Sequence, residues 1–257
     1  MIKTFKLTLA IVAFALLWCI PLQADEHESK ESIGTGVLIT PKEGHEEALI
    51  KAITDYHLWV ANFEGHMRFN WYSILTGPDT GKYIAYSGGH SWADFDAEYD
   101  WQKEAGEVFE QNVAPHIESM ERWMSSEMTE MSHWPDSWEG YTMFTIEHWY
   151  VKNGHYGPFR QGLKRIVETL KAGGYTGYWG FSSNASGGYG NQITIISPKK
   201  GWSDMAEKDP SFYDIMSKEL GGEDQFQEFM SNWASTFKTG KNYTLKYLAG
   251  ASDYGDE

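Results

Sequence analysis

VLITPKEGHEEALIKAI, at residues 37–53, is an apolar strand-like run, a turn that ends in glycine, and then apolar residues at helical spacing. WYVKNGHYGPFRQGLKRI, at residues 149–166, repeats that order. In both stretches a glycine and a histidine close the turn, and the amphipathic pattern begins directly after them. The sequence therefore predicts the same unit of strand, glycine turn and helix twice.

Seven pairs of identical residues stand 110 positions apart. The pairs are Gly44 and Gly154, His45 and His155, Trp92 and Trp202, Asp94 and Asp204, Glu118 and Glu228, Met120 and Met230, and Trp123 and Trp233. A fixed offset of this length indicates an internal duplication, because it is close to the size of a small domain. Each half is expected to be a complete assembly that packs on the other.

Each half shows hydrophobic patterns in the order β-α-β-β-α-β, which is the ferredoxin-like order. In the first half the pattern predicts a long polar helical region at about 92–128, broken near Pro115. A sheet with both helices on one face leaves its other face apolar, and two such sheets cover these faces by packing on each other. We therefore predict an α+β fold, in which two tandem ferredoxin-like repeats form a pseudo-dimeric α+β barrel.

The amino terminus has the order of a secretory signal, with a basic start, an apolar run and a small-residue cleavage site. We expect a periplasmic or secreted protein with this organisation: signal peptide at 1–24, disordered leader at 25–33, first repeat at 34–131, linker at 132–140, second repeat at 141–250 and acidic tail at 251–257. The one cysteine, Cys19, lies within the signal. The mature chain is thus expected to lack disulfides and thiolate metal ligands.

The charge and the aromatic content of the chain limit the classes of partner that it can bind. The formal net charge is −15, and such a surface repels phosphate backbones and anionic lipids, so we expect neither nucleic acid nor a membrane as partner after signal removal. Aromatic residues make up 16% of the chain, and they can either fill the barrel interior or line a cavity for a small molecule. The candidate ligand-binding residues are Trp71, Tyr72, Trp149, Tyr178 and Trp179. A monomer or a weak homo-oligomer is expected.

With the two quoted stretches and the Trp-x-Asp segments at Trp92 and Trp202, the chain resembles the dimeric α+β barrel superfamily. That group includes the antibiotic-biosynthesis monooxygenases and their haem-degrading relatives. The resemblance covers most of residues 34–250 as two tandem copies. It implies that the two halves form within one chain the barrel that relatives form as homodimers. It also implies a cofactor-independent or haem-assisted oxygenase that acts on a small aromatic substrate.

The resemblance also suggests catalytic residues. In haem-degrading members a histidine of the second helix ligates the iron, and His116 looks like the closest match in this chain. Those members use a strand asparagine and a tryptophan, for which Asn70 and Trp92 are the candidates. The cofactor implied is therefore haem or none. The alternative for His116 is an exposed histidine that follows the break at Pro115.

Other histidines and methionines allow further interpretations. A series of methionines follows His116 at regular spacing: Met120, Met124, Met128 and Met131. These side chains could be soft ligands for Cu(I), or they could form the buried face of a helix. His45 and His155 stand at helix starts, where an anion site or an exposed position is expected. Motifs such as HxH or HExxH are absent from the sequence, so no metal site is predicted.

Several functions therefore remain open. The first is an exported protein that binds a small hydrophobic or aromatic ligand in the barrel, with oxygenase-like activity as its extension. The second is an enzyme of the haem-binding or haem-degrading type, and the third is a structural or copper-binding exported protein. Convergence of His116, His66, His148 and Asn70 on one pocket would favour catalysis, whereas dispersal would favour binding.

Overall fold

The computed structural model describes residues 32–252. The expected signal peptide, nearly all of the expected leader and the acidic tail from residue 253 onward lie outside the described residues. Within 32–252, no helix is long and apolar enough to cross a membrane.

The first half contains four strands, two α-helices and three short 3-10 turns. They are β1 (Ile33–Pro41), α1 (Glu46–Val60), β2 (Asn70–Ile74), β3 (Tyr83–His90), η1 (Trp92–Phe95), α2 (Gln102–Asn112), η2 (Ala114–His116), β4 (Ile117–Glu127) and η3 (Thr129–Met131). The second half adds one helix to this order. Its elements are β5 (Met143–Val151), α3 (Tyr156–Ala172), β6 (Gly180–Ser186), β7 (Gln192–Lys199), η4 (Trp202–Met205), α4 (Phe212–Leu220), α5 (Glu223–Ala234), β8 (Phe237–Tyr247) and η5 (Ala249–Ala251).

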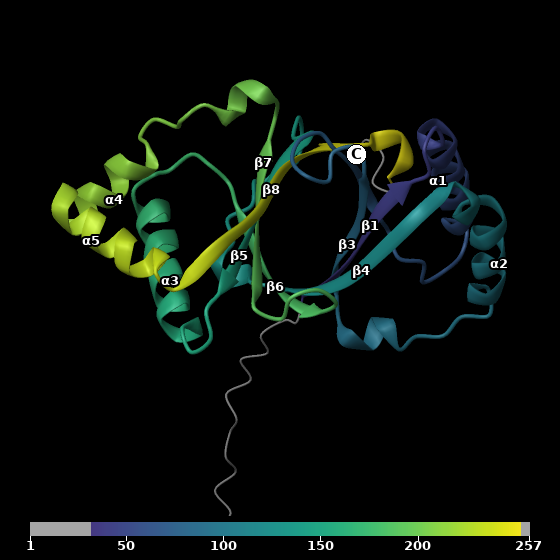
Figure 1. Cartoon of the computed structure of the whole chain (residues 1–257), viewed down its shortest axis with the longest axis horizontal. Helices are drawn as coiled ribbons and strands as arrows, with labels where there is room; N and C mark the ends of the chain where they lie inside the picture. Colours follow the sequence, from purple (N-terminus) through teal and green to yellow (C-terminus); the bar gives the residue numbers. More distant parts are fainter. Residues whose placement is uncertain (1–31, 253–257) are drawn as a thin grey trace, which may run out of the picture. The chain divides into compact units, whose positions relative to one another are not determined.

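The eight strands form one closed barrel in the order β1-β3-β2-β8-β5-β7-β6-β4. The two halves join at two antiparallel pairs, β2 with β8 and β4 with β6. In Figure 1, α1 and α2 lie outside the first set of strands, and α3, α4 and α5 lie outside the second set. The predicted fold class, a pseudo-dimeric α+β barrel of two β-α-β-β-α-β halves, is confirmed.

Alternation along the strands separates a helix-facing side from the interior. In β1, Val37 and Ile39 pack with Leu49 and Ile53 of α1. In the second half, a larger cluster forms between the sheet and its helices, and Phe159 is fully buried at its centre. The apolar positions of the two quoted stretches thus bury the first helix of each half against its own sheet.

A third cluster fills the barrel interior. Ile74, Ile84, Ile146 and Leu245 are buried there, each at 6% exposure or less. Rings from both halves pack around them, and these are Tyr72, Tyr86, Trp123, Phe144 and Tyr243. Side chains of the protein itself therefore occupy the space between the two sheets.

The duplication offset changes within the second half. Lys42 N donates to His116 O, and Lys152 N donates to Thr236 O at the equivalent place. The offset is therefore 110 at the donor and 120 at the acceptor, because α4 and its connections lengthen the second half. The identities at Glu118, Met120 and Trp123 accordingly pair residues of strand β4 with residues of helix α5, and they do not reflect equivalent positions.

The predicted helical region at about 92–128 is wrong beyond α2. Residues 117–127 form strand β4, which pairs with β1 over its whole length. A spacing of four residues is close to the period of a helix, but it is also twice the period of a strand. Met120 and Met124 therefore lie on one face of a strand, and the methionine pattern did not distinguish the two structures.

Close packing over glycine constrains the interior. The ring of Trp123 covers Gly36 so closely that a Cβ there would collide with it. We expect Gly36→Ala to lower the free energy of unfolding by about 1–3 kcal/mol, because the ring must move within a packed core. Chemical unfolding measures this change.

Gly106→Ala is the matched control, because Gly106 lies inside α2 with open space around it. Alanine should raise stability there by up to about 1 kcal/mol through its better helix propensity. Equal stability of the wild type and Gly36→Ala would contradict the packing that we describe.

Candidate functional site

His116 pairs with a second histidine. Its Nδ1 lies 3.0 Å from Nδ1 of His45, and the ring centroids are 5.3 Å apart. This centroid separation places both nitrogens close to the line between the rings, which is the geometry of a hydrogen bond. One imidazole therefore donates and the other accepts. In the second half His155 has Thr236 in the equivalent place, so the pair has no counterpart there.

The three residues suggested as catalytic lie apart. His116 ends η2, Asn70 begins β2, and Trp92 lies in η1 with 42% of its surface exposed. Within 32–252, no hydrogen bond or ring contact joins any two of them. His66 Nδ1 bonds to Phe63 O in a loop, and His148 lies in the barrel interior. The histidines are dispersed, which favours binding over catalysis by a histidine cluster.

Three of the five suggested ligand-binding aromatics are structural. Each indole N–H of Trp71, Trp149 and Trp179 has a protein acceptor: His57 Nε2 at 2.7 Å, Glu147 Oε1 at 2.7 Å and Met131 O at 2.9 Å. All three rings pack in the clusters beneath the helices. Tyr72 faces the interior, with its ring 5.3 Å from that of Phe144. Of the five, Tyr178 lines a hollow.

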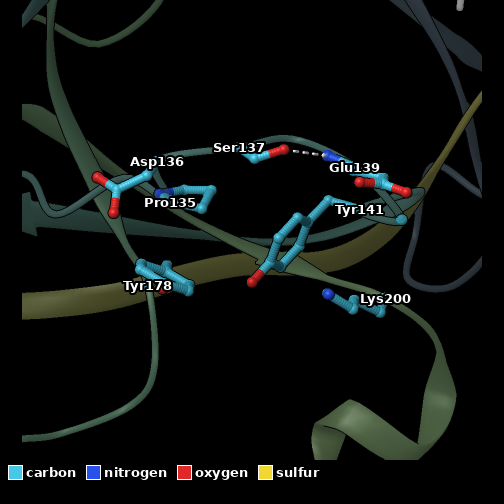
Figure 2. A pocket seen from close by; sticks show the side chains of 8 residues that line it. Pro135, Asp136, Ser137, Glu139, Tyr141, Tyr178 and Lys200 are labelled. Atoms are coloured by element: carbon cyan, nitrogen blue, oxygen red, sulfur yellow. Dashed lines mark hydrogen bonds between the residues drawn. The ribbon is translucent and has the colours of Figure 1, made fainter.

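That hollow, which we call the Tyr141 hollow, has a volume of about 500 Å³. Its lining residues are Pro135, Asp136, Ser137, Glu139, Gly140, Tyr141, Tyr178 and Lys200. Figure 2 shows Tyr141 between Pro135 and Tyr178 on one side and Lys200 on the other. Three segments supply these residues: the connection from η3 to β5, the residues before β6, and the end of β7.

The connection that builds the hollow is held to the sheet. His133 and Trp179 exchange backbone hydrogen bonds of 2.7 and 3.0 Å. The ring of Trp134 lies against Gly180, where a Cβ would collide with it. Ser137 Oγ accepts from Glu139 N at 3.2 Å, as drawn in Figure 2. The segment expected as a linker therefore forms a defined wall.

Aromatic rings and charged side chains surround the Tyr141 hollow. The rings of Tyr141 and Tyr178 meet edge to face, at 6.0 Å and 86°. Lys200 Nζ lies 5.1 Å from the centroid of Tyr141, within reach of a cation–π interaction. Burial raises the pKa of Tyr141, so its hydroxyl stays protonated at neutral pH. Asp136 and Glu139 add two exposed carboxylates on the connecting segment.

A histidine stands behind this wall. The His133 ring lies 5.1 Å from the rings of both Tyr178 and Trp179. Burial, together with the charge of Lys171, lowers the pKa of His133. The imidazole is therefore neutral at pH 7. Sequence reasoning noted His133 only as a neighbour of the methionine series and missed Tyr141 and Lys200, although the run of tryptophan and tyrosine at 134–141 was a signal that could have drawn attention to this segment.

A second hollow, of about 300 Å³, lies against β5, β7 and β8. Its lining residues are Thr76, Thr145, Ile146, Glu147, Ile195, Ser197, Asn242, Tyr243 and Thr244. Hydroxyl and amide groups dominate this set, and they show no acid–base pair. We therefore assign the candidate site to the Tyr141 hollow.

The interior also holds a polar cluster. Gln192 Nε2 lies 2.9 Å from His148 Nδ1, so Nδ1 accepts and the proton resides on Nε2. His148 Nε2 then donates to the Tyr243 hydroxyl at 3.0 Å. Burial lowers the pKa of His148 to about 4, and Lys241 acts in the same direction. The imidazole is therefore neutral at pH 7, with a partner for each nitrogen.

No protein-family model matches the chain, and no curated protein sequence matches it. Solved structures do match it, and among them are two proposed monooxygenases. One is a proposed monooxygenase from Lactobacillus acidophilus, with a TM-score of 0.51 and 13% identity over 84% of this chain and 94% of that chain. The other is a proposed monooxygenase from Fusobacterium nucleatum, with a TM-score of 0.50 and 13% identity over 86% and 94%. The chain has the dimeric α+β barrel fold.

A chlorite dismutase from Candidatus Nitrospira defluvii also matches, with a TM-score of 0.49 and 10% identity over 84% of this chain and 91% of that chain. This likeness is too low to carry an inference. At 13% identity, the two neighbours above show the fold of the dimeric α+β barrel and nothing of its chemistry.

Haem does not fit the residues of the described hollows. A haem site needs an axial ligand beside an apolar slot. His116 lines neither hollow, and both nitrogens of His148 have partners in the interior. Neither hollow is lined by a histidine, and carboxylates line the larger one. Residues 32–252 also contain no group of three histidine, cysteine or acidic side chains that could hold a metal ion.

The neutral His148 predicts a pH dependence of stability. Its pKa is about 4 in the folded barrel, against 6.5 for an ordinary histidine. The stabilisation is therefore complete above pH 6.5 and is lost as the pH falls toward 4, by about 3 kcal/mol in total. Urea unfolding of the wild type and of His148→Gln, between pH 7.5 and pH 4, measures the loss.

The variant should lose less stability than the wild type over this range, by about 2–3 kcal/mol. His155→Gln is the matched control, because His155 is exposed at the start of α3. It should follow the wild type. Equal pH slopes for the wild type and His148→Gln would show that His148 is not buried in its neutral form.

Proposed function

We propose that the protein binds a small molecule that stacks a ring face on the aromatic side chains of the Tyr141 hollow. The observation that carries this proposal is the hollow itself, about 500 Å³ in volume and walled by two tyrosines at right angles. A space of this size accommodates one small organic molecule. The barrel interior is packed with the protein's own side chains, so we place the ligand outside it.

Oxygenase-like turnover of the bound ligand is the catalytic alternative. Two structural neighbours are proposed monooxygenases, although the likeness extends only to the fold. The observation that favours chemistry is His133, a neutral imidazole in ring contact with Tyr178. A neutral imidazole can accept a proton from an acidic ligand group. In this alternative, His133 is the candidate base, beside Tyr178 and outside the lining of the hollow.

We also propose that the chain is exported and that residues 1–24 are removed. The support is the order of basic, apolar and small residues at the amino terminus, followed by Asp25. Intact mass spectrometry of the protein from the extracytoplasmic fraction should give a chain that begins at Asp25. A full-length chain confined to the cytoplasm would contradict the proposal.

The binding proposal predicts that the two tyrosines control affinity. Tyr178→Leu and Tyr141→Leu should each weaken ring binding by about fivefold to tenfold, since a stacked ring is worth about 1 kcal/mol. Ligand-observed NMR with a set of ring-bearing molecules, including phenol, 1-naphthol and simple sugars, identifies binders. Isothermal titration calorimetry of the variants then measures affinity.

Tyr189→Leu is the matched control, because this tyrosine is 67% exposed on another loop and its ring contacts Tyr150. Its affinity should equal that of the wild type. Unchanged affinity in both hollow variants would place the ligand elsewhere. Oxygen uptake with 1-naphthol tests the catalytic alternative in parallel: uptake that falls in His133→Gln supports it, and no uptake overturns it.

A further inference from the structure

We propose that the ligand of the Tyr141 hollow is a carbohydrate, bound as a neutral sugar ring that is either free or at the end of a chain. This inference rests on the proposed function and specifies its ligand class. It depends on three properties of the hollow: the mixture of hydrogen-bonding groups, the row of exposed rings and the charge.

The lining mixes hydrogen-bond donors and acceptors on all sides. Asp136 and Glu139 offer carboxylates, Lys200 offers an ammonium group, and Ser137, Tyr141 and Tyr178 offer hydroxyls. A flat hydrocarbon or simple aromatic ligand would cover these groups without pairing them, which costs free energy. A sugar ring carries a hydroxyl on most carbon atoms and can pair with donors and acceptors at once. The lining therefore fits a polyhydroxylated ring better than a hydrocarbon one.

The rings continue beyond the hollow as a row. From Tyr178 the row runs to Tyr141 at 6.0 Å, to Trp138 at 6.3 Å and to Trp134 at 5.6 Å, measured between centroids of neighbouring rings. Trp138 is 50% exposed and Trp134 is 37% exposed. The C–H face of a sugar packs on such rings through apolar and electrostatic contact, while its hydroxyls stay at the edge. More than one sugar unit can therefore contact the surface.

The charge of the surroundings disfavours anionic aromatic ligands. Two carboxylates and one ammonium group line the hollow, and the formal net charge of the chain is −15. Phenolates and aromatic carboxylates would meet a repulsive field. The Lys200 ammonium group already lies over the Tyr141 ring, where it is available to a hydroxyl at the rim. A neutral sugar has no such penalty, and its hydroxyls can donate to the carboxylates.

The wall is also formed in advance of binding. Backbone bonds between His133 and Trp179 hold the base of the segment, and the contact of Trp134 with Gly180 holds its side. Tyr141 N donates to Trp138 O at 3.0 Å, which holds the backbone of these two residues together. A preformed wall lowers the entropy cost of binding, which matters for weak ligands such as sugars.

Calorimetric titration of the full purified protein tests the inference. The probes are glucose, galactose, xylose and maltotetraose on one side, and phenol and 4-hydroxybenzoate on the other. We expect at least one sugar to bind and the phenols to bind more weakly or not at all. Tighter binding of maltotetraose than of glucose would identify a chain end as the source, and the reverse order would identify a free sugar.

Two substitutions locate the sugar. Asp136→Asn keeps the size of the side chain but removes its charge, and it should weaken sugar binding about tenfold. Trp138→Ala removes one ring of the row and should weaken the tetrasaccharide more than the monosaccharide. Asp100→Asn is the matched control, because Asp100 is exposed in the first half, away from the lining residues. Thermal unfolding confirms that all variants are folded.

The outcomes separate this inference from the proposed function. Phenol binding that depends on Tyr178, without sugar binding, would overturn the carbohydrate and leave ring binding at the hollow intact. Sugar binding that neither Asp136→Asn nor Trp138→Ala weakens would overturn the assignment of the sugar to this site. Binding of neither probe class would overturn both proposals.

Discussion

Closure of the barrel by two strand pairs is the constraint on which the rest of the structure depends. Each half carries helices on one face of its sheet only, so its other face must be covered by the other half. The pairs β2–β8 and β4–β6 remove the sheet edges at which the halves meet. The enclosed volume must then be filled, and glycine at residues 34 and 36 lets the rings of Tyr86 and Trp123 lie directly on strand β1. The aromatic content of the chain is partly a result of this requirement.

The same closure explains the pairing of the buried polar groups. His148 lies between strands β7 and β8 in the interior, where burial disfavours a charged imidazole. Its nitrogens therefore need partners from neighbouring strands, and Gln192 and Tyr243 supply them. These contacts consume the hydrogen-bonding capacity that an active site would need. The candidate site lies outside this cluster, on the connection between the halves.

Sequence reasoning succeeded where the spacing of the apolar residues fits either a helix or a strand but not both. Strand β1 and helix α1 follow from residues 37–53 because an apolar run ends at the glycine turn and the apolar residues after the turn fit one helix face. It failed at β4, since methionines four apart satisfy both periods, and this error also placed His116 in a helix. The fixed offset of 110 hid the additional helix α4, because chance identities continued beyond it. The hollow could not be assembled from the sequence, since Tyr141, Tyr178 and Lys200 come from three separate segments that only the barrel brings together.

The two halves differ at positions that line the hollow. At the offset of 110 that holds for strands β2 and β3, Tyr178 corresponds to Arg68 and Lys200 to His90. His90 makes a 2.7 Å hydrogen bond with Ser87 and its ring contacts that of Phe95, whereas Lys200 contacts the ring of Tyr141. The histidine pair of His45 and His116 shows the opposite asymmetry, since it is confined to the first half. The duplicated strands and helices therefore supply a common frame. Each half carries its own polar features where the chain leaves the sheet. Within residues 32–252, the ring-lined wall is found in the second half.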